Sequence, residues 1–350
     1  MYEAHPHIGT DKLPGIISSI RKTIIDAGGE FLLEKKVTDF IMDGDVVRGV
    51  LTSGNEKYMS DYVILATGHS ARDIYDVCRN HNIDLEMKPF AMGVRVEHPQ
   101  ELIDKIQYHG DNRGEFLPAA SYSLVRQVDG RGVYSFCMCP GGFIVPSATS
   151  QEEIVVNGMS PSGRNSPYAN SGIVVEVKAE DLFKYSSFAE MAGIQFQKDL
   201  EREAWKNGGH TQKAPAQRLA DFVSGKSSGS LPKVSYFPGV TASPLHSWLP
   251  KSIGRRLREG FRLFGQAMNG YLTNEAVILG VESRTSSPVR IPRDPCSLQH
   301  TRINGLYPCG EGSGYTGGIV SSAVDGMRTA EAIAGKIMQA GTGQNISLVT

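Results

Sequence analysis

Apolar side chains recur along the first part of the chain at spacings typical of one helix followed by several short strands. Residues 13–25 place leucine and isoleucine at intervals of three and four, which predicts an amphipathic helix that Thr10 or Asp11 caps and Gly28 ends. Short apolar runs separated by turn residues then predict a series of strands at 30–33, 37–42, 46–51, 56–59 and 63–66. Residues 70–80 predict a second helix.

The pattern changes from residue 90 onward, where apolar and polar residues alternate over short segments. Alternation predicts strands that bury one face, and it occurs at 90–97, 122–128, 133–139, 143–145, 154–157 and 172–177. Helical spacing predicts helices at 188–205, 214–223 and 250–268. We therefore expect a mostly antiparallel sheet in the middle of the chain, inserted between two parts of another domain.

The segment 301–333 combines a short apolar run, a cluster of glycines and a stretch of helical spacing. It predicts a strand, a glycine-rich turn and a helix. Glycines let a ligand approach the backbone closely, and the first N–H groups of a helix have no acceptor within the helix. Glu311 directly follows the strand, where its carboxylate is placed to accept a hydrogen bond from a sugar or polyol hydroxyl.

The glycines of this turn fit two different nucleotide-binding patterns. Gly312, Gly314 and Gly317 spell G-x-G-x-x-G, which opens a Rossmann unit and is followed there by a second strand ending in an acid. No such strand is predicted after residue 333, so this interpretation is not favoured. The other pattern, T-x-x-x-G-L-Y-x-x-G-D/E, is matched by Thr301, Gly305, Leu306, Tyr307, Gly310 and Glu311.

The second pattern resembles an element of two-domain flavoproteins. Residues 62–71, YVILATGHSA, strengthen the resemblance, because an apolar strand runs there into the A-T-G turn that these flavoproteins place near their cofactor. The phrases ATGHSARD at 66–73 and FCMCPGG at 136–142 are similar to a branch of bacterial FAD-dependent dehydrogenases. Over essentially its whole length, the chain resembles the glutathione-reductase-like FAD-dependent oxidoreductases.

The resemblance implies a fold class and a domain organisation. The fold would be α/β, or α+β overall, with an incomplete glutathione-reductase-like FAD-binding domain and an inserted, mostly antiparallel β-sheet substrate or cap domain. Residues 1–89 would form the first part of the FAD-binding domain, residues 90–290 the inserted domain, and residues 291–350 the return segment of the FAD-binding domain.

The resemblance also implies a cofactor site and an activity. FAD would be the cofactor, with NAD(P)H as an electron partner, and a small organic substrate would be oxidised or reduced by hydride transfer through flavin N5. Glu311 would bind the ribitol chain, and the start of the following helix would face the pyrimidine end of the flavin. The implied cofactor-binding residues are Thr67, Gly68, Gly310, Glu311, Gly317, Gly318 and Ile319.

One expected element of this family is not found. The N-terminal G-x-G-x-x-G that clamps the ADP half of FAD does not occur between Met1 and Tyr62, so we expect this chain to be the C-terminal portion of a longer protein. Whether the chain retains FAD without that motif stays open. The first alternative function is therefore a non-catalytic flavoprotein fragment that binds a ligand or a partner.

The candidate catalytic residues are few. His69 follows the A-T-G turn, where it would be a donor to a flavin or substrate, although a lone histidine is more often structural. Arg284 lies in a segment that passes near the isoalloxazine in related flavoproteins, and it is a candidate partner for an anion. Cys137 and Cys139 share a strand face, so a second alternative is a thiol oxidoreductase, against the ordinary interpretation of two buried thiols.

Two polar groups elsewhere have both an ordinary and a functional interpretation. Asn157, Ser160, Arg164 and Asn170 lie in a polar region that would line a substrate pocket, although such residues also form ordinary turns. The helix at 250–268 carries four arginines on one side, which is typical of a solvated face and alternatively of a phosphate site. The four arginines are Arg255, Arg256, Arg258 and Arg262.

Composition narrows the setting. The 36 basic and 37 acidic residues balance, so no strong field would attract nucleic acid or a membrane surface. No apolar run approaches the roughly 20 residues of a membrane-spanning helix, and no secretory signal is seen, so we expect a cytoplasmic protein. Five cysteines fit reduced thiols, and their spacing predicts no metal site. The oligomeric state is left open.

Overall fold

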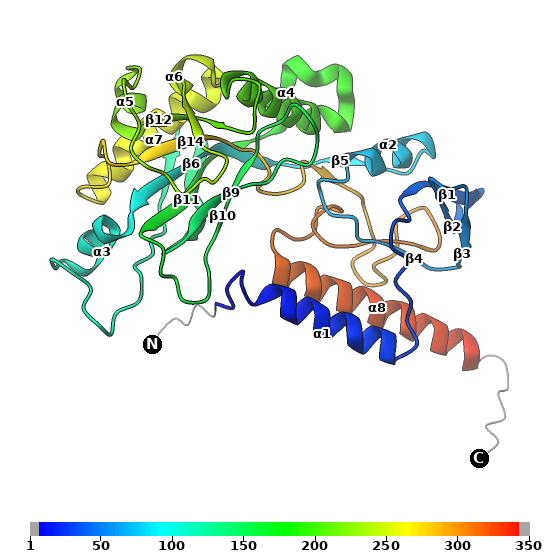
Figure 1. Cartoon of the computed structure of the whole chain (residues 1–350). Helices are drawn as coiled ribbons and strands as arrows, with labels where there is room; N and C mark the ends of the chain where they lie inside the picture. The colour runs from blue at the N-terminus through cyan, green and yellow to red at the C-terminus, as the bar shows by residue number, and fades with distance from the viewer. Residues whose placement is uncertain (1–6, 343–350) are drawn as a thin grey trace. The chain divides into compact units, whose positions relative to one another are not determined.

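The computed structural model describes residues 7–342, and the chain divides into two compact units (Figure 1). Unit 1 contains the residues up to 31, then 91–177 and 196–285, and unit 2 contains 32–90, 178–195 and the residues from 286 onward. The fold is mixed α/β with one large, mostly antiparallel sheet. Within 7–342, no helix is both long and apolar enough to cross a membrane.

A seven-stranded sheet forms the centre of unit 1, in the order β13-β12-β14-β6-β11-β8-β7. Strand β12 pairs in parallel with β13, whereas the pairs β12–β14, β14–β6, β11–β8 and β7–β8 are antiparallel. Strands β9 and β10 form a separate antiparallel pair. The bounds are β6 Phe90–Pro99, β7 Val125–Val128, β8 Arg131–Cys139, β9 Phe143–Pro146, β10 Val156–Met159, β11 Tyr168–Val177, β12 Ala214–Arg218, β13 Val240–Ala242 and β14 Val277–Glu282.

Unit 1 also contains several helices. The longest of them within the unit, α7, packs against β7, β8 and β11 and beside α5 and α6 (Figure 1). Its apolar row, including Ile253, Leu257, Phe261 and Phe264, is buried, so the amphipathic prediction for 250–268 is confirmed. The bounds are α1 Leu13–Asp26, α3 Gln100–Tyr108, α4 Ala192–Asn207, α5 Leu219–Ser224, α6 Leu245–Trp248 and α7 Lys251–Ala267; the first residues of α4 belong to unit 2.

Three predictions about local secondary structure are wrong. Residues 214–223 are not one helix, because 214–218 pair between β13 and β14 as strand β12 before α5 begins. Residues 30–33 form no strand. Helix α1 has Lys12 at its N-cap without a side-chain bond, since Asp11 instead accepts hydrogen bonds from the Ser162 backbone N–H at 2.6 Å and its hydroxyl at 2.7 Å.

Unit 2 is built from smaller sheets. Strands β1, β2 and β3 form an antiparallel meander, β5 pairs with β15, and β4 pairs in parallel with β16. Its core gathers apolar side chains from all these parts, including Phe40, Val47, Ile74 and Leu306. The bounds are β1 Val37–Asp43, β2 Val46–Thr52, β3 Lys57–Met59, β4 Val63–Leu65, α2 Arg72–Asn80, β5 Glu86–Met87, the 3₁₀ segment η1 Ala179–Met191, β15 Val289–Arg290, β16 Leu306–Pro308 and α8 Ile319–Thr342.

Candidate functional site

The two stretches that the sequence singled out meet in unit 2. Strand β16 runs parallel to β4 with Leu306 opposite Val63, and the Cys309 amide donates to the Leu65 carbonyl at 3.0 Å. Because parallel strands end at the same edge of a sheet, the segments that follow them emerge side by side. The A-T-G turn at 66–68 and the glycine-rich turn at 310–318 therefore share one edge, which we call the glycine edge.

Close backbone contact at the glycine edge requires glycine at two positions. A Cβ atom added to Gly312 would overlap the Gly68 carbonyl, so a side chain there would push the two turns apart. Gly314 has φ +84°, and a Cβ there would lie 2.8 Å from the Val289 carbonyl oxygen. The Tyr75 hydroxyl donates to the Gly312 carbonyl at 2.7 Å, and this hydrogen bond holds the turn in place.

The carboxylate of Glu311 is held by His69. His69 Nδ1 lies 2.7 Å from Glu311 Oε1, and the two side chains remain 15% and 24% exposed. Among the described residues, no second side chain bonds this carboxylate. An acceptor at the exit of β16 is thus oriented by its neighbour and is still reached by solvent.

Of the remaining predicted cofactor residues, Gly310 is buried and its amide donates to Asp325 at 2.8 Å, whereas the others present open backbone or lie at the start of a helix. Thr67 is exposed, and nothing lies within 4 Å of a Cβ added to Gly68 or Gly317. Helix α8 begins just beyond, where the Ser322 amide donates to the Gly318 carbonyl at 3.0 Å. The N–H groups ahead of Ser322 belong to a helix start, which carries unsatisfied donors and a partial positive charge. Ile319, the first helical residue, is exposed.

A buried ion pair behind the turn was not predicted from the sequence. Asp325 of α8 accepts the Gly310 amide at 2.8 Å and pairs with Arg293 at 2.6 and 3.0 Å. Burial opposes ionisation of Asp325, but the hydrogen bonds from Arg293 and from the Gly310 amide lower its pKa. The pair ties the helix to the turn. Its only sequence signal was an acid on an amphipathic helix that also carries Glu331, and such an acid is too common to single out.

Arg284 lies in unit 1 and is bound by carboxylates. Its guanidinium pairs with Glu201 at 2.9 Å and Glu153 at 3.0 Å, and it donates to Thr149 Oγ1 at 2.7 Å. All three charged side chains are buried. Two carboxylates already balance this guanidinium, so a role toward an external anion stays a prediction.

Cys137 and Cys139 differ in exposure. Cys139 is buried, as expected for a thiol in a sheet, but the same expectation is wrong for Cys137, which is exposed. The register of β8 against β11 shifts between Phe136 and Cys139, and Cys137 has φ +48°, so a β-bulge turns it away from the sheet. Its contact with the Cys139 side chain lowers the pKa of Cys137 to about 6 and raises that of Cys139.

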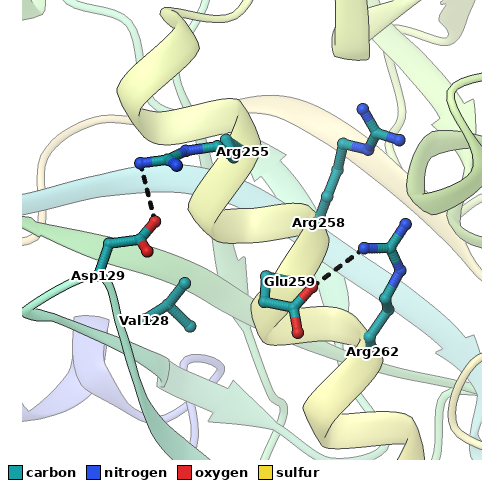
Figure 2. A pocket seen from close by; sticks show the side chains of 6 residues that line it. All are labelled: Val128, Asp129, Arg255, Arg258, Glu259 and Arg262. Atoms are coloured by element: carbon teal, nitrogen blue, oxygen red, sulfur yellow. Dashed lines mark hydrogen bonds and ion pairs between the residues drawn. The ribbon is translucent and has the colours of Figure 1, made fainter.

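The arginines of α7 form ion pairs and hydrogen bonds with neighbouring residues. Figure 2 shows three of them around a cavity of about 500 Å³, with Arg255 directed toward Asp129 and Arg262 toward Glu259. These ion pairs are 2.8 and 3.0 Å long, and Arg258 Nε donates to the Val223 carbonyl at 3.1 Å. The contacts support the interpretation of a solvated, ion-paired face.

Within 7–342, no group of three or more histidines, cysteines or acids is arranged to hold a metal ion.

Comparison with known proteins gives a family match, a curated relative and several loosely similar solved structures. Residues 89–285, more than half of the chain, match a family model described as FAD-dependent protein, C-terminal domain-like. An uncharacterized protein of Clostridium beijerinckii is 41% identical over 336 residues, which cover 95% of this chain and 62% of that protein.

The solved structures align more loosely. A flavin-dependent brominase, Bmp2, aligns at 13% identity and a TM-score of 0.36 over 95% of this chain and 57% of its own. An oxidoreductase from Methanosarcina mazei aligns at 12% identity and a TM-score of 0.35 over 91% of this chain and 54% of its own. The chain thus spans somewhat more than half the length of each of these three proteins.

Proposed function

This chain belongs to the family described as FAD-dependent protein, C-terminal domain-like, and from that premise we propose that it acts in an FAD-dependent oxidoreductase whose flavin is held at the glycine edge of unit 2. The observation that carries the proposal is the meeting of the A-T-G turn with the glycine turn, where Gly312 packs against the Gly68 carbonyl. Two bare backbone segments with one oriented carboxylate suit a ligand that needs close approach and hydroxyl recognition.

The residues at this edge fit the groups of FAD. The Glu311 carboxylate, held by His69, would accept hydrogen bonds from ribitol hydroxyls. The start of α8 at Gly317, Gly318 and Ile319 would direct N–H groups toward the N1 and O2 end of the ring and stabilise negative charge there. Thr67 and Gly68 would border the cofactor with open backbone.

When bound, FAD supplies the hydride chemistry at its N5 atom, and the protein contributes orientation and electrostatics. His69 lies within hydrogen-bond distance of Glu311, so it would also fix the direction of the carboxylate and hold a proton beside it. We further propose a small organic substrate and a nicotinamide as electron partner. Both follow from the sequence resemblance.

Flavin titration tests the assignment of Glu311. Quenching of FAD fluorescence on addition of the purified chain should be saturable, and Glu311→Ala should weaken binding by about tenfold, since a hydrogen bond to a charged group is worth more than the 1.4 kcal/mol of one decade. Glu331→Ala, an exposed acid farther along α8, is the matched control and should bind like the wild type. Equal affinity of Glu311→Ala and wild type would remove Glu311 from the site.

The titration also addresses the non-catalytic alternative. If the chain binds FAD, addition of NADH or NADPH under anaerobic conditions should bleach the flavin absorbance when a nicotinamide is the donor. If it binds no FAD at any concentration, the fragment interpretation replaces the oxidoreductase for this chain.

A thiol oxidoreductase is the second candidate, and the placement of Cys137 favours it. The thiol is exposed on a β-bulge beside Cys139, and contact with the Cys139 side chain lowers its pKa, which raises the share of reactive thiolate. Titration of free thiols before and after mild oxidation should show the loss of two thiols in wild type and of none in Cys139→Ser.

A further inference from the structure

Unit 1 contains a second cavity, which shares no lining residue with the cavity of Figure 2. It measures about 760 Å³ and is formed by the end of α3, the segment before β7, the end of β8, the loop before β11 and the end of α7. We call it the Arg164 cavity, after the only charged side chain in its lining within the described part of the chain. Its volume falls in the range of small-molecule sites, which is roughly 300–1,000 Å³.

Arg164 itself is the most informative residue of this cavity. The residue is half-buried, and its Nε atom is fully buried and has no hydrogen-bond partner; within the described residues the guanidinium forms no ion pair. A buried donor left unpaired costs free energy, so it calls for an explanation. In the cavity of Figure 2, by contrast, Arg255 and Arg262 each face a carboxylate.

The backbone around Arg164 is held in a strained conformation. Arg164 has φ +45°, which is uncommon for any residue except glycine, and its amide donates to the Pro161 carbonyl at 3.0 Å. A Cβ added to Gly141 would overlap the Arg164 carbonyl, so the two backbones are in direct contact. Asp11 anchors the same loop through Ser162. Strain that the surroundings maintain in this way is found preferentially at ligand sites.

The rest of the lining is apolar, aromatic or neutral. Tyr108 and Tyr122 supply rings, Met138 and Met268 supply flexible thioethers, and Ser121 adds a hydroxyl. The walls are themselves tied, since the Tyr108 hydroxyl donates to the Pro118 carbonyl at 2.9 Å and Gln107 Nε2 contacts Met268 Sδ at 3.6 Å. Rings and thioethers bind the body of an apolar ligand, and methionine adapts to its shape.

We propose that the Arg164 cavity binds an organic carboxylate with an aromatic or aliphatic body, whose carboxylate pairs with the Arg164 guanidinium. The planar guanidinium matches a carboxylate with two parallel hydrogen bonds. A single cation with no acid in the lining balances one negative charge, which favours a monoanion over a doubly charged phosphate. The site lies wholly in unit 1, and its occupation does not depend on the proposed flavin site.

Isothermal titration of the full chain with 2-naphthoate tests this proposal, with 2-naphthamide and inorganic phosphate as matched probes. Naphthoate should bind saturably at one site, and the neutral amide and phosphate should bind at least tenfold more weakly. Arg164→Gln should reduce naphthoate affinity by about tenfold, and Arg164→Lys should restore part of it through the charge alone. Arg255→Gln, at the other cavity, should leave binding unchanged.

Several outcomes would overturn the proposal: no saturable binding of naphthoate to the wild-type chain, equal binding of the acid and the amide, or an unchanged affinity in Arg164→Gln. Met138→Trp guards against a misfolded Arg164 variant, because it fills the cavity from another wall and should abolish naphthoate binding. Thermal unfolding of each variant shows whether it is folded, and saturable binding to a folded Met138→Trp protein also contradicts the proposal.

Discussion

The central strands of unit 1 and the glycine edge of unit 2 differ in how far their charged side chains are buried and paired. In the sheet, Arg95 is fully buried and is bound by Glu282 at 2.7 and 3.2 Å and by Asn170 at 2.6 Å. At the glycine edge, Glu311 keeps 24% of its side chain exposed and bonds to His69. Paired charges of the first kind hold a structure together, whereas an oriented but accessible carboxylate is available to a ligand.

The same contrast holds for bare backbone. The glycines of the sheet allow strands to pack, as Gly93 does against the Ile173 carbonyl. At the glycine edge, Gly68 and Gly317 face open space instead. A region that leaves both backbone and a carboxylate uncovered differs from one that packs its glycines and pairs Arg95 internally, and this difference supports the proposed cofactor site.

Breaking the buried pair of the sheet should give the largest effect. Arg95→Met leaves the buried Glu282 carboxyl group without its cation, so the free energy of unfolding should fall by about 3–5 kcal/mol. Urea denaturation followed by tryptophan fluorescence measures it, because Trp205 and Trp248 both lie in unit 1. Arg255→Met, which removes an exposed ion pair, should cost less than about 1 kcal/mol. Similar losses in the two variants would contradict the contrast.

Glu97 is a buried acid of the same sheet that lacks a cation among the described residues, and it should make stability depend on pH. Burial raises its pKa to about 7, against hydrogen bonds from Ser235. An acid whose pKa is raised in the folded state stabilises the fold most below its unfolded pKa of about 4.3. The free energy of unfolding therefore falls as the pH rises through 7, by an amount on the order of 3 kcal/mol.

The difference in unfolding free energy between wild type and Glu97→Gln isolates this dependence. Burial lowers the pKa of His98 to about 4, so that residue acts in the opposite direction, and the subtraction cancels it. Relative to Glu97→Gln, the wild type should lose stability between pH 4.5 and pH 8. A difference that stays constant over this range would show that Glu97 does not titrate as described.

At the glycine edge, a single methyl group should separate the two turns. Gly312→Ala would overlap the Gly68 carbonyl and should cost about 1–3 kcal/mol, with weaker flavin binding. Hydrogen exchange in residues 306–319 measures the local loss. Gly326→Ala, in α8 with nothing within 4 Å of the added Cβ, should be neutral or stabilising by up to about 1 kcal/mol. Unchanged exchange in Gly312→Ala would show that the close approach is not needed.

The smallest expected effect concerns Cys137. We expect its thiol to react faster than an ordinary cysteine, with no change in the stability of the protein. At pH 6, iodoacetamide should alkylate it about tenfold faster than an ordinary thiol of pKa about 8.5, allowing for the lower nucleophilicity of a weakly basic thiolate. Mass spectrometry follows Cys137 and the exposed Cys296 in one sample, and Cys137→Ser identifies the signal. Equal alkylation rates from pH 5 to pH 8 would remove the basis of the thiol oxidoreductase.

Local elements were predictable from the sequence more readily than their partners. The amphipathic pattern located α7 and α8. The sequence also predicts a cofactor near the A-T-G and glycine turns, and the structure brings these two turns together. The same kind of pattern at 13–25 predicted α1, yet none of its residues is buried. Periodicity reveals that a helix has an apolar face, but not what covers that face.

Long-range contacts account for what the sequence did not reveal. The pairing of His69 with Glu311 joins residues far apart in the chain, and the Arg293–Asp325 pair follows no motif. Arg164 stood out only as part of a polar region, because an unpaired guanidinium is recognised only when all its neighbours are known. The strand at 214–218 was missed for a similar reason, since its partners β13 and β14 lie elsewhere in the sequence.

The most direct test of the flavin site is the visible absorption spectrum of the purified chain after incubation with excess FAD and removal of unbound cofactor, recorded beside Glu311→Ala. The account predicts flavin bands that survive in the wild-type chain and are reduced in the variant. A wild-type spectrum without flavin bands, or bands of equal strength in both proteins, would contradict a cofactor site at the glycine edge.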